Sequence, residues 1–96
     1  MKEEFTLELE AENNFSVLNR IINILNRRRV RIKRMMAHEM DGDFRRGGVI
    51  MVLFTTPDMM DRVKDQLDKL IEVDHVAYET GTSRYVELSE RVLDLD

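Results

Sequence analysis

The feature that most constrains this 96-residue chain is an uninterrupted apolar run, GVIMVLF, at residues 48–54. A short run with no polar residue at alternate positions indicates a strand with both faces buried. Such a strand belongs inside a sheet, so we expect residues 48–54 to form its central strand. The preceding DGD at residues 41–43 and RRGG at residues 45–48 predict a hairpin loop.

Three other segments show the two-residue period of strands. Apolar residues alternate with polar ones over residues 5–11, which predicts a strand with one buried face. Residues 30–40 predict an edge strand, with Val30 and Ile32 facing inward and Arg31 and Lys33 facing solvent. Arg31 and Lys33 can lie across from Glu8 and Glu10 on the same sheet face, or they can keep unwanted partners away from the free edge. Residues 73–78 predict a short fourth strand, which Gly81 follows.

Two segments show a helical period instead. Apolar residues recur at steps of three and four from Ser16 onward, and Asn14 or Ser16 can cap this helix. The arginines at 27–29 fit its last turn, where cations meet the negative end of the helix dipole. Residues 56–58, Thr-Pro-Asp, predict the start of a second helix, with threonine as the cap and proline in the first turn.

The resulting order is β-α-β-β-α-β. This order predicts an α+β, ferredoxin-like fold in which two helices cover one face of an antiparallel sheet. We expect a single domain over residues 1–81. Residues 82–96 alternate weakly, so an extra strand, a short helix or a disordered tail are all compatible with the sequence.

Charge is distributed unevenly along the chain. The net charge is −4, yet the segment NRRRVRIKRMM at residues 26–36 contains six Arg or Lys and no acid. A helix end followed by an edge strand accounts for these cations. Nucleic-acid binding is disfavoured, because the domain is acidic overall and Glu8 and Glu10 would repel phosphate. Without cysteine or an apolar run of spanning length, we expect a cytoplasmic protein that does not contact membranes.

Residues that carry catalytic chemistry are not arranged in a recognisable pattern. No Ser-His-Asp spacing, nucleophile elbow or glycine-rich phosphate loop is present. His38, Glu39, Asp41 and Asp43 match no zinc or calcium ligand spacing. We therefore expect a non-catalytic protein without a metal site.

Two tracts resemble known regulatory proteins. ENNFSVLNRIINILNRR resembles the opening of an ACT domain, a small-molecule-sensing module of amino-acid metabolism. QLDKLIEVDHVAYET, Gln66 to Thr80, is similar to the second helix and last strand of the regulatory small subunits of acetolactate synthase. The resemblance covers about Glu4 to Thr80. It implies the short, single-domain form of such a subunit.

The resemblance also implies partners and a role. It suggests a homodimer, joined through the second strand and first helix, that activates an acetolactate synthase large subunit. Thiamine diphosphate, Mg²⁺ and FAD would then be on the large subunit, with no cofactor on this chain. A branched-chain amino acid would bind at the dimer interface. A stand-alone ACT sensor that regulates another enzyme is the alternative.

Site residues follow from the same resemblance. Three matched positions differ from the family pattern, with Ser16 in place of Gly, Arg31 in place of Asn and His38 in place of a small residue. Valine, another ligand or no ligand therefore remain open. Arg29 replaces the glycine that usually ends the first helix, which implies strain if this residue has a positive φ. The implied ligand-binding residues are Asn13, Phe15, Ser16, Val17, Arg31 and His38, and the implied interface residues are Arg31, Lys33, Met35 and Met36.

Overall fold

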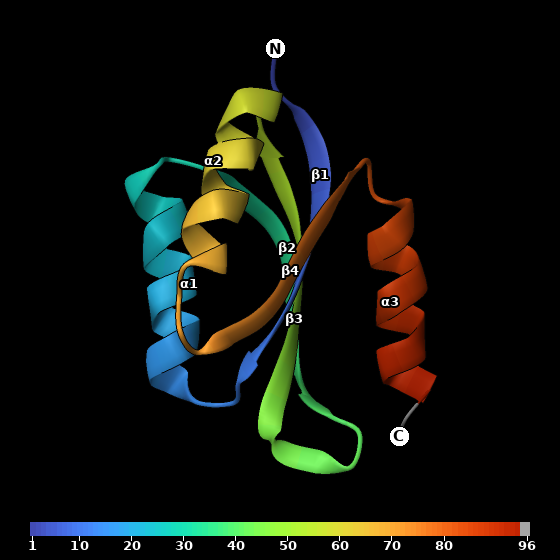
Figure 1. Cartoon of the computed structure of the whole chain (residues 1–96). Coiled ribbons are helices and arrows are strands. Elements are labelled where there is room, and N and C mark those ends of the chain that lie inside the picture. The colour runs from blue at the N-terminus through green and yellow to red at the C-terminus, as the bar shows by residue number, and fades with distance from the viewer. Residues whose placement is uncertain (95–96) are drawn as a thin grey trace.

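The computed structural model describes residues 1–94, and this part of the chain confirms the ferredoxin-like order. The sheet is antiparallel, with strand order β2-β3-β1-β4. Figure 1 views the sheet nearly edge-on, with α1 and α2 on one face and α3 on the other. The elements are β1 (Glu3–Glu12), α1 (Phe15–Arg27), β2 (Arg31–Met40), β3 (Asp43–Thr55), α2 (Pro57–Asp68), β4 (Val73–Thr80) and α3 (Ser83–Asp94).

Strand β3 is central, as predicted, but it is longer than the apolar run. It begins at Asp43, so the prediction that residues 45–48 belong to a loop is wrong. Gly47 and Gly48 are buried within the sheet because other side chains lie over them. A Cβ on Gly48 would lie 2.5 Å from His38 Nε2, and one on Gly47 would lie 3.2 Å from Asn13 Oδ1. The reversal between β2 and β3 occurs at residues 41–42, where Gly42 has a φ of +80°.

The main core lies between the sheet and helices α1 and α2. Both helices begin at the predicted caps: the Asn14 side chain accepts a hydrogen bond from Val17 N, and Thr56 accepts one from Met59 N. Burial of the apolar face, at roughly 25 cal/mol per Å², is the main driving force for docking them. The fully buried side chains of this core include Leu7, Ile21, Leu25, Met51, Leu53, Met60, Val63 and Leu67.

Strand β2 is an edge strand with an irregularity near its start. Its register with β3 shifts between Ile32 and Arg34, which moves the alternation by one residue. Ile32 therefore packs on the main core, whereas Met36 packs on the cluster of the opposite sheet face. The predicted position of Lys33 across from Glu8 and Glu10 is wrong, because β3 lies between β2 and β1. Lys33 instead forms an ion pair with Glu4 at 2.9 Å.

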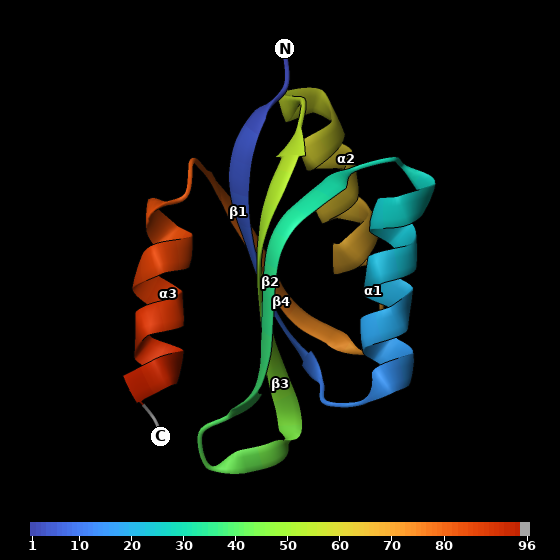
Figure 2. The ribbon, with the colours of Figure 1, turned by 180° about the vertical axis from the view of Figure 1, so that it is seen from behind.

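Helix α3 is formed by the segment for which the sequence left three alternatives. Tyr85, with Leu88 and Val92, packs on Ile50 and Val52 of β3. Glu8 on β1 approaches Arg84 on this helix at 3.5 Å. The sheet is therefore covered on both faces, and Figure 2 shows the same three layers from behind. The predictions for residues 95–96 lie outside the described part of the chain. No helix within residues 1–94 combines the length and apolar character needed to cross a membrane.

Helix α1 ends in a left-handed turn at Arg29, whose φ is 55°. The Arg29 N–H donates to Asn26 O, and the Val30 N–H donates to Leu25 O, both at 3.0 Å. These two bonds close the helix in the manner of a Schellman motif, which usually places glycine at this position. The strain implied for Arg29 is therefore present in the backbone.

Candidate ligand site beside the edge strand

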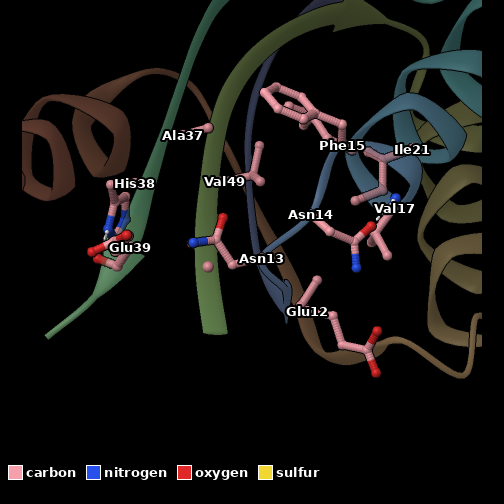
Figure 3. Close-up of a pocket in the computed structure, with 14 residues that line it drawn as sticks. Glu12, Asn13, Asn14, Phe15, Val17, Ile21, Ala37, His38, Glu39 and Val49 are labelled. Atoms are coloured by element: carbon pink, nitrogen blue, oxygen red, sulfur yellow. Dashed lines mark hydrogen bonds between the residues drawn. The ribbon is translucent and has the colours of Figure 1, made fainter. Parts of the chain in front are cut away.

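A groove of about 590 Å³ lies between the N-terminal end of α1 and the C-terminal half of β2. Figure 3 shows Asn13, Asn14 and Phe15 on one side of this groove and His38 and Glu39 on the other. The floor is apolar, so it suits an aliphatic group. The groove is lined by Ala11, Glu12, Asn13, Asn14, Phe15, Val17, Leu18, Ile21, Ala37, His38, Glu39, Gly47, Gly48 and Val49.

The first wall is the start of α1. The Asn14 side chain accepts from Val17 N at 3.0 Å, and Asn14 O accepts from Leu18 N. The N–H groups of Phe15 and Ser16 have no acceptor among the described residues. Free N–H groups at a helix start, together with the positive end of the dipole, favour an anion such as a carboxylate.

Asn13 fixes the turn that presents this helix end. Its Nδ2 donates to Phe44 O at 2.9 Å, and its backbone N–H donates to Arg45 O at 2.9 Å. The Asn13 Oδ1 lies above the bare backbone of Gly47. The turn is thus held against β3, and a side-chain oxygen remains available at the groove.

The second wall is formed by Ala37, His38 and Glu39 of β2. The half-buried His38 ring lies over Gly48, and its Nδ1 is 2.9 Å from Glu39 O. The Glu39 carboxylate is exposed and forms no ion pair within residues 1–94. An unpaired carboxylate can hold an ammonium group with a charge-assisted hydrogen bond.

The structure brings some of the proposed ligand residues together and separates others. Asn13, Phe15, Val17 and His38 all line the groove. Ser16 lies next to it in the chain but is not a lining residue. Arg31 is paired with Phe54 at the other end of β2, seven residues from His38, or about 23 Å along an extended strand.

Several lining residues were missed when we read the sequence. Ala37 and Glu39 lie at alternate positions of β2. The predicted alternation placed them on the solvent face with Arg31 and Lys33, whereas the register with β3 places them on the face that α1 covers. Ile21 follows Val17 by one helical turn, so the apolar helix pattern contained this signal. In the described part of the chain, no three His, Asp or Glu residues are grouped so that they could bind a metal ion.

The antiparallel sheet and its helices define a ferredoxin-like domain, with a groove at one edge between the start of α1 and the edge strand β2. A family model described as the ACT domain matches residues 13–76, which is more than half of the chain. The chain therefore belongs to the ACT domain family. ACT domains are regulatory, non-catalytic domains that bind amino acids and commonly dimerise.

Solved structures share the fold at low sequence identity. The ACT domain from GTP pyrophosphokinase of Chlorobium tepidum matches with a TM-score of 0.69 and 16% identity, covering 82% of this chain and 100% of that one. A homoserine dehydrogenase from Thiobacillus denitrificans matches with a TM-score of 0.71 and 18% identity, covering 83% of this chain and 17% of that one.

The acetolactate synthase small subunit from Thermotoga maritima also shares this fold. Its TM-score is 0.69 at 18% identity, and the match covers 79% of this chain and 47% of that one. This chain thus corresponds to about half of that subunit. No curated protein matches in sequence. At identities of 16–18%, these structural matches show the fold alone.

Proposed function

We propose that this ACT domain is a cytoplasmic regulatory small subunit of acetolactate synthase and that its groove binds a branched-chain amino acid. The arrangement of the groove is the observation that supports this proposal most directly. Free helix N–H groups lie on one wall, the Glu39 carboxylate lies on the other, and an apolar floor separates them. An aliphatic α-amino acid carries the complementary carboxylate, ammonium and side chain.

The tract from Gln66 to Thr80 supports the choice of partner. It forms the end of α2 and all of β4, and it resembles the small subunits over this length. The shared fold of the Thermotoga maritima small subunit agrees with this choice. Thiamine diphosphate, Mg²⁺ and FAD would remain on the large subunit, and this chain would act on its activity through contact.

A homodimer through β2 would complete the groove. β2 is hydrogen-bonded to β3 on one side, and its other edge is unpaired within the described residues. A free edge is usually covered or paired. Antiparallel pairing of two β2 strands would bring the start of the second copy's β2 alongside the C-terminal half of this strand. The second copy's β2 would then lie beside Ala37 and Glu39, at the margin of the groove.

The proposal is tested by mixing the purified chain with the acetolactate synthase large subunit of the same organism. We expect a rise in synthase activity and calorimetric binding of valine, leucine or isoleucine. Glu39→Gln should weaken amino-acid binding by about tenfold or more, because it removes a charged partner of the ammonium group. Glu90→Gln on α3, which is also exposed, serves as the control. Unchanged synthase activity would refute the proposed partner.

A stand-alone amino-acid sensor is the second candidate. The folds shared with the ACT domain of a GTP pyrophosphokinase and with part of a homoserine dehydrogenase favour it, since the matched regions belong to other enzymes. Amino-acid binding without any effect on the large subunit would support this candidate. Failure to bind any amino acid would exclude it.

A further inference from the structure

A second hollow, of about 210 Å³, lies between the sheet and the last turns of α3. Figure 2 shows these turns beside the hairpin that joins β2 and β3. We propose that this hollow binds an aliphatic amine. It lies on the face of the sheet opposite the groove, so its ligand would be separate from the amino acid proposed above and would not depend on the choice of partner enzyme.

A row of three residues crosses the strands at this hollow. Gly48 of β3 pairs with Glu10 of β1 on one side and with His38 of β2 on the other. These residues face α3, because Ile50, two positions along β3 from Gly48, packs with Tyr85 of that helix. Gly48 has no side chain, and a Cβ there would lie 2.5 Å from His38 Nε2. The His38 ring can therefore extend over β3, toward the side on which Glu10 lies.

The hydrogen bond made by the His38 ring determines what its other nitrogen can do. Nδ1 lies 2.9 Å from the carbonyl oxygen of Glu39, and a carbonyl oxygen can only accept a hydrogen bond. In the neutral ring Nδ1 therefore carries the proton, and Nε2 is left as an acceptor. Nε2 has no hydrogen-bond partner within residues 1–94. The hollow thus offers an acceptor that an N–H group of a ligand can satisfy.

Two carboxylates at the hollow have no cationic partner in the described part of the chain. Glu10 and Asp41 line it, both are exposed, and neither forms an ion pair. The other charged lining residues, Glu8 and Arg91, each form an ion pair with a side chain of α3. His75 lies across from Glu10 on β4, but it forms no ion pair with it. The remaining charge is negative and favours a cation.

Apolar side chains complete the hollow and select the kind of cation. Ile50 of β3 and Leu88 and Val92 of α3 line it. A bare metal ion is not matched, because no three His, Asp or Glu among residues 1–94 are grouped to hold one. An aliphatic ammonium fits, since its N–H groups can meet Nε2 and a carboxylate while its methylenes lie on the apolar side chains. The carboxylate of an amino acid would instead face like charges.

Three probes that share one carbon chain and differ in charge test this inference: n-butylammonium, 1-butanol and butyrate. Titration of the full chain at low salt, followed by ¹⁵N NMR, gives both the affinity and the position of binding. We expect n-butylammonium to bind with a Kd of about 1 mM and to shift the signals of Gly48, Leu88 and Val92. 1-Butanol should bind about tenfold more weakly or worse, because it lacks the charge, and butyrate should not bind.

Two variants locate the site. Glu10→Gln keeps the side-chain shape and should weaken n-butylammonium binding by about tenfold. Glu79→Gln is the matched control, because Glu79 is an exposed carboxylate on the same sheet face that does not line the hollow. Gly48→Ala should displace the His38 ring and weaken binding as well.

Several results would overturn the amine site. They are no binding of n-butylammonium, equal binding of 1-butanol, equal effects of Glu10→Gln and Glu79→Gln, and shifts confined to groove residues such as Val17. Each of these results would leave the proposed function intact, since synthase activation and valine binding test it separately.

Discussion

Replacement of Arg29 by glycine should make this domain more stable. Arg29 occupies the left-handed region at a φ of 55°, where a Cβ approaches the following carbonyl. Its side chain is exposed and forms no hydrogen bond or ion pair within the described residues. The substitution therefore removes backbone strain without removing a visible side-chain contact.

The expected size of this effect follows from two opposing terms. A residue with a Cβ costs about 1–2 kcal/mol in the left-handed region. Glycine loses more backbone entropy on folding, and this loss offsets about 0.5–1 kcal/mol of the stabilisation gained by removing the strain. The net stabilisation by Arg29→Gly should be about 0.5–1 kcal/mol. For a domain of this size, such a change corresponds to a rise in melting temperature of roughly 3–6 °C.

Thermal unfolding followed by circular dichroism, at a fixed protein concentration, measures this shift. Arg27→Gly is the matched control, because Arg27 is also exposed but lies within the last helical turn. Glycine at that position should lower stability by about 0.5–1 kcal/mol. A melting temperature for Arg29→Gly at or below that of the original chain would show that Arg29 stabilises the fold by means other than its backbone geometry.

Three further predictions concern the dimer edge, a helix cap and an ion pair. Met36→Asp should weaken the dimer by placing a carboxylate near its axis, and an unchanged mass in light scattering would contradict this. Thr56→Ala should lower the free energy of unfolding in denaturant by about 1 kcal/mol, because the Met59 N–H loses its acceptor; an unchanged midpoint would argue against the cap. The hydrogen bond from Arg20 lowers the pKa of Glu72 below its ordinary value of 4.5, so this pair stabilises the fold above that pH and the contribution is lost as the pH falls through the lowered pKa. In an NMR titration, Arg20→Gln should raise the pKa of Glu72, and an unchanged value would refute the assignment.

The regular elements could be predicted from sequence because their signals are local. Asn14 and Thr56 mark the two helix starts through side chains that cap nearby N–H groups, and both caps are present. The apolar run after Gly48 correctly indicated a central strand. The sequence predicted that both faces of this strand are buried, yet the two predicted helices cover only one face of the sheet. A further element covering the other face could therefore have been predicted. Helix α3 supplies that cover.

The errors arose where a residue's role depends on contacts that are distant in sequence. Gly47 and Gly48 look like turn residues, yet they are needed because Asn13 and His38 lie over them within the sheet. The bulge after Ile32 reverses which residues of β2 face the core, and no local pattern reveals it. Both the contacts over the glycines and the bulge in β2 affect the groove, so its lining could be predicted only in part. Asn13 and Val17 were named through the resemblance to the opening of an ACT domain, whereas Glu39 became visible only through the strand register.

Helix α3 also limits how this protein can assemble. Because helices lie on both faces, neither side of the sheet is open for stacking against another sheet or for a partner to lie across. Contacts with other chains must be made through helix surfaces or in the plane of the sheet. A pair joined through β2 would form a flat, eight-stranded slab with β4 at each outer margin. Glu79, which is exposed and forms no ion pair among the described residues, would lie on each margin and oppose the addition of a third copy there.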